Sequence, residues 1–154
     1  MSTLIRRMTL QDVSEVHEID VLSFNLPWPE RSFRFELTEN PVARAWVAEV
    51  DDRVAAMLVL WFIIDEAHVA TIAVHPHFRR LGIGEQILLC ALRSVKAEGA
   101  ERAFLEVRAG NGAAQTMYKK YGFEVAGVRR GYYKDNNEDA LLMNLEKFDC
   151  LEAE

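Results

Sequence analysis

A strand-like run in the middle of the chain passes through a glycine turn into an amphipathic helix. Residues 67–76 (AHVATIAVHP) are rich in Val, Ile and Thr and end at a proline, which predicts a strand. Residues 79–84 (RRLGIG) set two arginines beside two glycines, and a helix is predicted over 82–98, stopping at Gly99. A chain built around such a strand, turn and helix is expected to be an α/β protein.

The turn has the chemistry of an anion-binding site. The first turn of a helix carries amide hydrogens without partners in the helix, and about half a positive charge. Glycines let the backbone approach a ligand closely, and arginine adds forked donors that suit phosphate. The chain has a net charge of −6, so a basic cluster indicates a local site rather than a surface for nucleic acid or anionic membrane. A surface turn with solvated arginines is the alternative.

Three kinds of phosphate loop can be compared with this turn. The dinucleotide fingerprint needs a third glycine, which residues 82–87 (GIGEQI) lack. The P-loop needs Gly-Lys-Ser/Thr, but Glu85 follows Gly84. The pattern that fits is [Gln/Arg]-x-x-Gly-x-[Gly/Ala], running from Arg79 to Gly84. This pattern resembles the acyl-CoA pyrophosphate loop of the GNAT acetyltransferases.

Two further segments stand in the order and at the distances that this family shows. They are residues 105–124 (LEVRAGNGAAQTMYKKYGFE) and 129–143 (RRGYYKDNNEDALLM). Together with the turn they resemble the RimI-like branch of the GNAT family, which acetylates protein N-termini. The resemblance covers nearly the whole chain, including residues 26–33 (LPWPERSF), and is strongest from Thr71 to Met143. It implies acetyl-CoA as cosubstrate, with no metal.

The pattern of elements agrees with one domain over residues 1–154. The expected fold is a mixed, mostly antiparallel seven-stranded sheet flanked by about four helices, in the order β-α-α-β-β-β-α-β-α-β-β. Strands are predicted over 4–8, 43–50, 53–64, 67–76, 102–108, 123–130 and 139–148. Helices are predicted over 9–20, from Pro29 to about 40, over 82–98 and over 111–122.

Glu106 stands where the family has its general base. Strand alternation puts Leu105 and Val107 on one face and Glu106 and Arg108 on the other, so Glu106 is not required in the core. The alternative is an ordinary strand carboxylate that pairs with Arg102 or Arg108.

Tyr118 stands where the family has its general acid, on a helical face shared with Ala114, Met117 and Tyr121. The alternative is a core tyrosine. A phenol has a pKa of about 10 and a thiol one of about 8.5, so full proton transfer to the departing thiolate is uphill by about 2 kcal/mol. We therefore expect Tyr118 to stabilise the thiolate by a hydrogen bond as much as to complete a transfer.

The resemblance also implies a surface for acetyl-CoA. In this family the strand before the turn pairs through its backbone with the pantetheine arm, and an asparagine like Asn111 contacts CoA while capping its own helix. The predicted cofactor-binding residues are Ile72, Ala73, Val74, Arg79, Arg80, Leu81, Gly82, Ile83, Gly84, Glu85, Asn111 and Tyr118.

Two aromatic segments are expected to line a channel for the acceptor peptide. By resemblance, Leu26, Pro27 and Trp28 form one wall, and Tyr132 and Tyr133 the other. The alternative is a hydrophobic staple and ordinary hairpin aromatics. Leu26 stands where the family more often has an aromatic residue, which leaves the first-residue preference open. The family's usual bacterial substrate is the N-terminal alanine of ribosomal protein 18 of the small subunit, and its archaeal relatives are broader.

Other functions stay open at this point. A GNAT enzyme for a small-molecule amine would favour acidic residues near the acceptor, and Asp65 and Glu66 could serve. A lysine side chain is a further possible acceptor. A regulatory module that only binds acyl-CoA would not need both Glu106 and Tyr118.

The cysteines and histidines point to no metal or disulfide chemistry. Cys90 and Cys150 are far apart with no CxxC, and we expect free thiols in a reducing, cytoplasmic compartment. His75 and His77 flank Pro76 without a nearby carboxylate cluster, and we expect surface residues. The longest apolar run has 11 residues, too short for a membrane-spanning helix.

Overall fold

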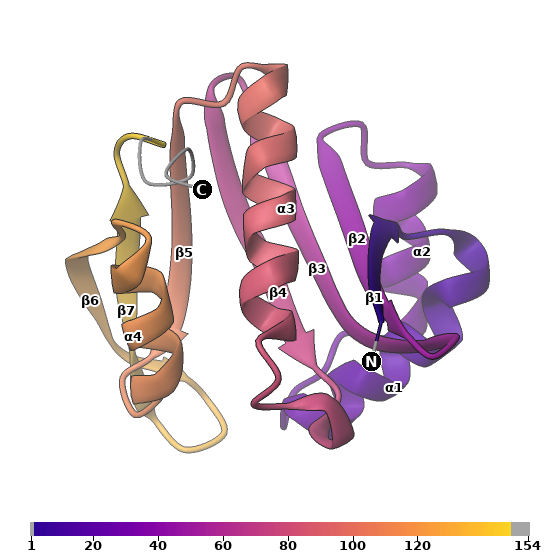
Figure 1. The fold of residues 1–154 in the computed structure, drawn as a ribbon. Helices are drawn as coiled ribbons and strands as arrows, with labels where there is room; N and C mark the ends of the chain where they lie inside the picture. Colours follow the sequence, from indigo (N-terminus) through magenta and orange to yellow (C-terminus); the bar gives the residue numbers. More distant parts are fainter. Residues whose placement is uncertain (1, 149–154) are drawn as a thin grey trace.

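The predicted strands form one seven-stranded sheet in the computed structural model, which describes residues 2–148 (Figure 1). The strand order is β1-β2-β3-β4-β5-β7-β6, and β4 and β5 are the only parallel neighbours within this range. The strands are β1 (Thr3–Arg7), β2 (Ala43–Val50), β3 (Arg53–Ile63), β4 (Glu66–Val74), β5 (Arg102–Arg108), β6 (Glu124–Tyr133) and β7 (Glu138–Leu145). The helices are α1 (Val13–Ser23), α2 (Glu30–Thr38), α3 (Ile83–Glu98) and α4 (Gly112–Lys120). The predicted fold class and element order are confirmed.

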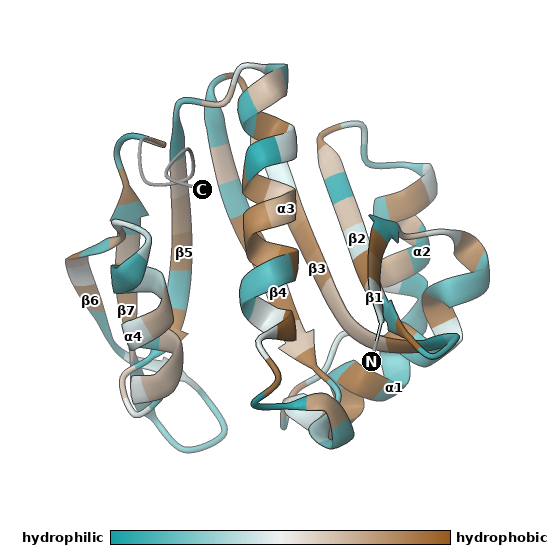
Figure 2. Ribbon diagram, viewed as in Figure 1, coloured by the Kyte–Doolittle hydropathy of each residue, from teal (hydrophilic) through white to brown (hydrophobic). Residues whose placement is uncertain are grey.

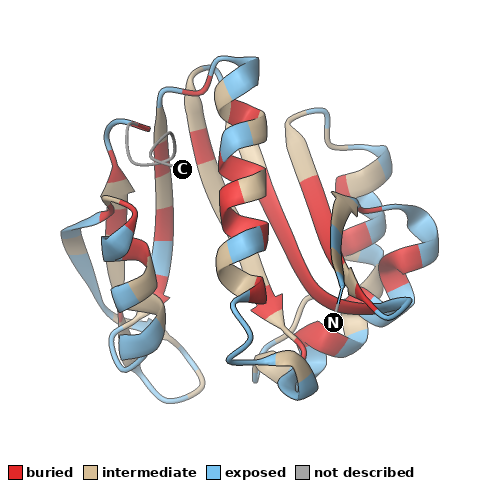
Figure 3. Cartoon of the chain, viewed as in Figure 1, coloured by how far each residue is buried: buried red, intermediate tan, exposed pale blue. Residues whose placement is uncertain are grey.

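Helices cover both faces of the sheet, and each face has its own apolar core. Helix α3 lies across one face with α4 beside it, and α1 and α2 lie on the other face (Figure 1). On α3, apolar side chains such as Ile87, Leu88 and Leu92 are buried against the sheet, and polar residues occupy most of the exposed positions of the helix (Figures 2 and 3). Phe33 of α2 anchors the opposite core with Val13 and Val16 of α1. The first of these cores holds α3, the helix that begins at the glycine turn.

Local sequence signals set most of the element boundaries. Asn111 accepts a hydrogen bond from the backbone N–H of Ala114 at 3.1 Å and caps α4 as predicted. Gly99 ends α3 in the left-handed conformation, also as predicted. At Thr9 the chain first makes a short 3₁₀ turn, η1 (Leu10–Asp12), before α1 begins. Strand β6 continues to Tyr133, beyond its predicted end, because its pairing with β7 resumes at Tyr133 and Glu138.

One expectation about the histidines is wrong. His77 is exposed, but His75 is buried at the end of β4, where the turn η2 (Pro76–Phe78) folds back over it. Its Nδ1 accepts the backbone N–H of His77, and burial lowers the pKa of His75. No group of metal-ligating side chains occurs within residues 2–148. Cys90 carries a free thiol, and Cys150 lies outside the described residues. In the same range no helix is long and apolar enough to cross a membrane.

Candidate active site

Strands β4 and β5 pair only at their first residues and then separate. The parallel ladder joins Glu66 to Arg102, Ala67 to Ala103 and His68 to Phe104, and no later pair follows within residues 2–148. The other edge of β4 stays paired with β3 as far as Val74. The β5-facing edge of β4 beyond His68 therefore offers backbone donors and acceptors to an extended ligand (Figure 1).

The predicted anion turn lies where β4 ends, at the mouth of this opening. Gly82 is the residue before α3 and takes a left-handed φ of 78°, which a glycine adopts freely. A Cβ on Gly84 would lie 3.3 Å from Cγ2 of Val74, so the absence of a side chain lets the first turn of α3 pack against β4. The amides of this first turn thus stand next to the open edge of β4.

The two arginines of the turn have different environments. Nε of Arg79 donates to the backbone carbonyl of Val74 at 2.9 Å, and its Nη2 donates to Oγ of Ser23 at 3.3 Å. Arg79 therefore ties the turn to β4 and α1. Arg80 has a left-handed φ of 65° and an exposed side chain. Both arginines are exposed, but the guanidinium of Arg79 is already directed toward Val74 and Ser23 by its two hydrogen bonds.

A carboxylate near the start of α3 reaches across to α4. Glu85 pairs with Nζ of Lys120 at 2.8 Å, and it also accepts the hydroxyl of Tyr121. Both contacts lower the pKa of Glu85, with Lys120 the larger cause. These contacts join the two helices whose strands, β4 and β5, have separated.

The predicted base is exposed on β5, on the face opposite the core of that strand. Leu105 and Val107 are buried, whereas Glu106 is exposed, as alternation predicts. Its charge raises the pKa of Tyr132 as the largest cause, and it adds to burial in raising the pKa of Tyr133. Glu106 and the two tyrosines of β6 therefore form one electrostatic group.

The arginines that could have neutralised Glu106 pair with other carboxylates. Arg102 binds Asp65 at 3.1 Å and Glu66 at 3.3 Å. Arg108 binds Asp135 and Glu138 on the β6–β7 hairpin. Within residues 2–148 neither arginine forms an ion pair with Glu106, so the alternative of an ordinary ion-paired carboxylate is wrong.

Tyr118 is buried on α4 and shares a helical face with Ala114, Met117 and Tyr121, and this face packs into the core, as the alternative of a core tyrosine expects. Its ring lies 5.7 Å from that of Phe123. Burial raises the pKa of Tyr118 to about 12, with a further contribution from Tyr133.

The α1–α2 loop presents the other predicted wall. Leu26 is exposed, and the ring of Trp28 lies 5.2 Å from that of Phe33. The backbone N–H of Trp28 donates to Asp20 at 2.7 Å, and Asp20 is buried at the end of α1. Sequence reasoning missed Asp20. An acidic residue at a buried position of a helix, just before a proline-rich loop, is the signal that could have identified it.

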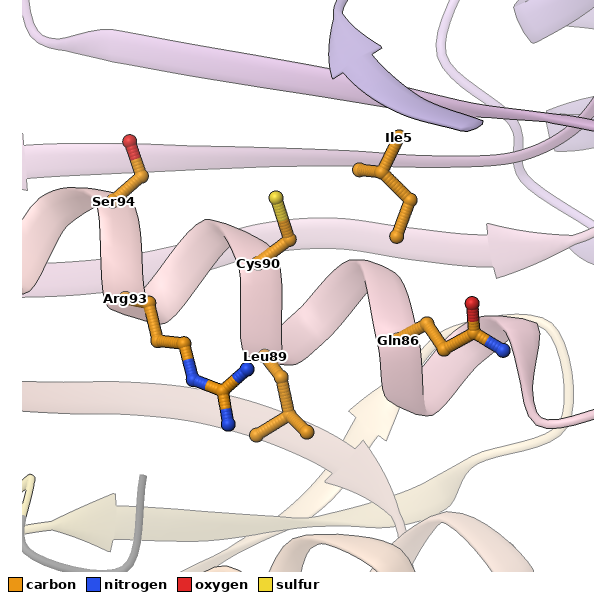
Figure 4. Close-up of a pocket in the computed structure, with 6 residues that line it drawn as sticks. All are labelled: Ile5, Gln86, Leu89, Cys90, Arg93 and Ser94. Carbon is orange, nitrogen blue, oxygen red and sulfur yellow. The ribbon is translucent and has the colours of Figure 1, made fainter. Parts of the chain in front are cut away.

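Two hollows on the surface are lined mostly by residues outside the predicted site. One lies between α3 and β1, and Figure 4 shows Cys90 and Ser94 on the side of α3 that faces Ile5, with Leu89 and Arg93 on the other side. None of the predicted site residues lines it. The second lies along α2 and includes Trp28.

Comparisons with known proteins agree with this geometry. The family model described as Acetyltransferase (GNAT) family matches residues 13–123. A Bacillus subtilis (strain 168) protein, whose name assigns it provisionally to [ribosomal protein bS18]-alanine N-acetylation, is 42% identical over 90% of this chain and 92% of its own length. The [ribosomal protein bS18]-alanine N-acetyltransferase of Salmonella typhimurium (strain LT2) is 34% identical over 90% of this chain and 93% of its own.

A solved structure extends the likeness to three dimensions. The crystal structure of the ribosomal-protein-S18-alanine N-acetyltransferase from Escherichia coli aligns with a TM-score of 0.86 and 30% identity, covering 94% of this chain and 93% of that one. The family model spans well over half of the chain, and it includes β4, the glycine turn and α4. The chain therefore belongs to the GNAT family, and it is an N-acetyltransferase that uses acetyl-CoA.

Proposed function

We propose that the protein transfers the acetyl group of acetyl-CoA to the N-terminal α-amine of a protein, with the N-terminal alanine of ribosomal protein bS18 as the substrate. The observation that carries the proposal is the opening between β4 and β5, which sets an unpaired strand edge beside Glu106. The acceptor is supported by the names of the B. subtilis and S. typhimurium relatives, which both refer to alanine N-acetylation of ribosomal protein bS18.

The open edge of β4 is proposed to pair with the pantetheine arm of acetyl-CoA through Ile72, Ala73 and Val74. The diphosphate would lie at the amides of the first turn of α3, with the exposed Arg80 facing it. In this proposal Arg79 braces the turn instead of binding the anion, because its guanidinium is already bonded to Val74 and Ser23. The remaining residues of the proposed cofactor site are Leu81, Gly82, Ile83, Gly84, Glu85, Asn111 and Tyr118.

Glu106 is proposed to take the proton of the attacking amine, directly or through one water. An α-amine has a pKa of about 7.8, so its deprotonation at pH 7 costs about 1 kcal/mol. A lysine with a pKa of about 10.4 costs about 4.6 kcal/mol. One solvent-accessible carboxylate suits the first acceptor better than the second. As the amine nitrogen bonds to the thioester carbonyl carbon, the carbon–sulfur bond breaks and the electron pair leaves on sulfur.

Tyr118 is proposed to donate a hydrogen bond to that departing sulfur. With a pKa of about 12 its proton is held more tightly than that of an ordinary phenol. Full transfer to a thiolate whose acid has a pKa of about 8.5 would be uphill by about 5 kcal/mol. A hydrogen bond from a fixed, buried hydroxyl avoids that cost and stabilises the developing charge.

The two aromatic segments are proposed as the walls around the acceptor. Leu26, Pro27 and Trp28 stand on the α1–α2 loop, and Tyr132 and Tyr133 stand on β6 beside Glu106. Leu26 and Tyr132 leave large parts of their side chains exposed, at 67% and 42%. Such surfaces suit the first apolar side chains of a peptide better than a polycation.

A small cationic acceptor has less support. Asp65 and Glu66, the acidic residues that kept this possibility open, are both paired with Arg102. They also stand at the closed end of the β4–β5 opening, and Arg102 is four residues, about 13 Å, from Glu106 along β5. We further propose that residues 1–154 act as one domain in the cytoplasm, with neither nucleic acid nor membrane as a direct partner.

The test is a peptide panel with free CoA as the readout. Peptides that differ only in the first residue are offered with acetyl-CoA, together with a twin of each whose α-amine is blocked and whose lysine is free. The proposal expects turnover of the Ala-starting peptide and none of the blocked twins. Turnover of the blocked twins would identify lysine as the acceptor, and turnover of a polyamine alone would favour the small-molecule alternative.

A further inference from the structure

A hydrogen bond joins the two proposed walls of the acceptor site. Nδ2 of Asn25 donates to Oδ2 of Asp135 at 2.8 Å, across a sequence separation of 110 residues. Asn25 stands immediately before Leu26 on the α1–α2 loop. Asp135 stands two residues after Tyr133, in the turn between β6 and β7. This hydrogen bond thus connects the α1–α2 loop to the β6–β7 turn, two segments that belong to different helices and strands.

Arg108 of β5 holds the side chain of Asp135 in place. Nη2 and Nη1 of Arg108 donate to Oδ2 and Oδ1 of Asp135 at 3.0 and 3.2 Å, a two-pronged contact that sets the carboxylate's direction. The Asp135 side chain is only 9% exposed. Arg108 also binds Glu138 at 3.2 Å, and Glu138 accepts the backbone N–H of Gly110 at 2.7 Å. The turn is therefore fastened to the end of β5 at Asp135 and again at Glu138.

The same guanidinium holds one of the wall residues. Cζ of Arg108 lies 3.9 Å from the centre of the Tyr133 ring, which is a close cation–π contact. Arg108 is two residues from Glu106, so both side chains project from the same face of β5. One cation therefore sets the position of Tyr133 and of Asp135 relative to the proposed base.

We propose that Asn25, Asp135 and Arg108 form a clamp that fixes the spacing between the α1–α2 loop and the β6–β7 turn, and so selects the first residues of the acceptor peptide. The inference rests on the proposed function. Arg108 and Asp135 are positioning residues, since they act through Tyr133 and the loop. A clamp of this kind affects capture of the peptide and leaves acetyl-CoA binding, on the far side of the opening, unchanged.

Asn25 offers the cleanest test because its side chain is exposed and its loss leaves the Arg108–Asp135 pair intact. Asn25→Ala removes the crossing bond, and Asn25→Asp sets a second carboxylate against Asp135. We expect Asn25→Ala to raise the KM for the Ala-starting peptide about 3- to 10-fold, the effect of one net hydrogen bond, with kcat within twofold. Asn25→Asp should raise KM further. Both variants should accept bulkier first residues relative to alanine than the parent enzyme does.

The controls separate positioning from stability. Arg44→Gln breaks an ion pair with Glu98 at 3.0 Å between β2 and α3, away from the site, and should leave the peptide KM unchanged. Calorimetry should give the same acetyl-CoA affinity for all variants. Asp135→Ala, alone and combined with Asn25→Ala, should show effects on KM that are less than additive, because both changes remove the Asn25–Asp135 hydrogen bond.

The outcomes distinguish the two proposals. If the parent enzyme acetylates the panel and both Asn25 variants match it in KM and first-residue preference, the clamp is wrong and the proposed function stands. If the parent enzyme acetylates no peptide N-terminus, the proposed function is wrong and the clamp fails with it. If the Asn25 variants had a lower melting temperature but an unchanged KM, the Asn25–Asp135 bond would contribute only to stability, and the clamp proposal would be wrong.

Discussion

The carboxylate of Asp20 accepts the backbone N–H of Trp28 at 2.7 Å although the residue is only 1% exposed. A buried acid of α1 thus fixes the loop that carries Leu26, Pro27 and Trp28. Burial raises the pKa of Asp20 in spite of the opposing hydrogen bond from Trp28. The folded protein therefore binds this proton more tightly than the unfolded chain, and ionisation of Asp20 at neutral pH costs stability.

Asp20→Ala is predicted to destabilise the fold, whereas Asp20→Asn is predicted not to. Alanine leaves the Trp28 N–H without its acceptor, which should lower the free energy of unfolding by about 1–3 kcal/mol and raise the peptide KM. Asparagine keeps an oxygen acceptor and carries no charge, so its free energy of unfolding at pH 7 should equal or exceed that of the parent. Urea unfolding of the three proteins measures this. Equal losses in both variants would contradict the prediction that an uncharged oxygen acceptor at position 20 is sufficient for the Trp28 N–H.

Asp12, unlike Asp20, is predicted to stabilise the fold at neutral pH and to lose this effect in acid. Burial raises its pKa, but the bonds from Arg6 and from the Thr9 N–H outweigh that, and the pKa is lowered below its ordinary value of 3.8. The stability that Asp12 contributes is therefore complete above pH 4 and is lost as pH falls through the lowered pKa.

Asp12→Asn should lower the free energy of unfolding at pH 7 by about 1–3 kcal/mol, since a hydrogen bond to a charged group is replaced by a neutral one. The difference from the parent should shrink as the pH falls below about 4. Glu30→Gln, which breaks an exposed ion pair with Arg34, is the control and should change stability by under about 1 kcal/mol. A difference that stays constant down to pH 2 would exclude the ionised Asp12 as its cause.

Gly84→Val is predicted to weaken acetyl-CoA binding. A Cβ at this position lies 3.3 Å from Val74, so a branched side chain must push the start of α3 away from β4. The displaced amides would no longer face the diphosphate, and Gly84→Ala should show a smaller effect in the same direction. Gly127→Ala is matched in crowding, with Leu142 at 3.4 Å, but lies on β6. If calorimetry found the same CoA affinity in all three variants, the glycine turn would not be part of the acetyl-CoA site.

The fold was predictable because its signals are local. The glycine turn, the Asn111 cap and the alternation around Glu106 each depend on neighbours within a few residues, and all three are confirmed. The predicted roles of the site residues rest on resemblance and stay predictions.

The contacts that the sequence could not reveal join distant segments. Asn25 and Asp135 are 110 residues apart, and nothing local to either residue indicates the other. The burial of His75 likewise depends on how η2 folds back, which the flanking Pro76 does not specify. Pairing of Arg108 with Asp135 is set by the register of β5 against β7, a property of the assembled sheet.

Glu106→Gln is predicted to lower kcat by about 10² to 10⁴ at pH 7, the usual span for a positioned general base. The amide keeps the shape of the side chain, so acetyl-CoA affinity should not change. The loss should shrink above the amine's pKa of about 7.8, because most of the substrate is then already neutral. Glu101→Gln removes an exposed carboxylate just before β5 and should have no effect. A change confined to KM would place Glu106 in substrate binding instead.

Tyr118→Phe is predicted to slow turnover without the pH signature of Glu106→Gln. If the hydroxyl only donates a hydrogen bond to the departing thiolate, its loss should raise the barrier by about 1.5–3 kcal/mol, the range for bonds to charged groups. This cost should stay constant as pH passes through the titration of the amine, since the buried phenol with a pKa of about 12 remains protonated throughout. Phenylalanine keeps the ring that packs on Phe123, so the melting temperature should change little. Parallel pH profiles of kcat for the parent, Tyr118→Phe and Glu106→Gln provide the measurement. A Tyr118→Phe loss that disappears at high pH, as expected for Glu106→Gln, would show that both residues act on the amine and would overturn the assignment of Tyr118 to the sulfur.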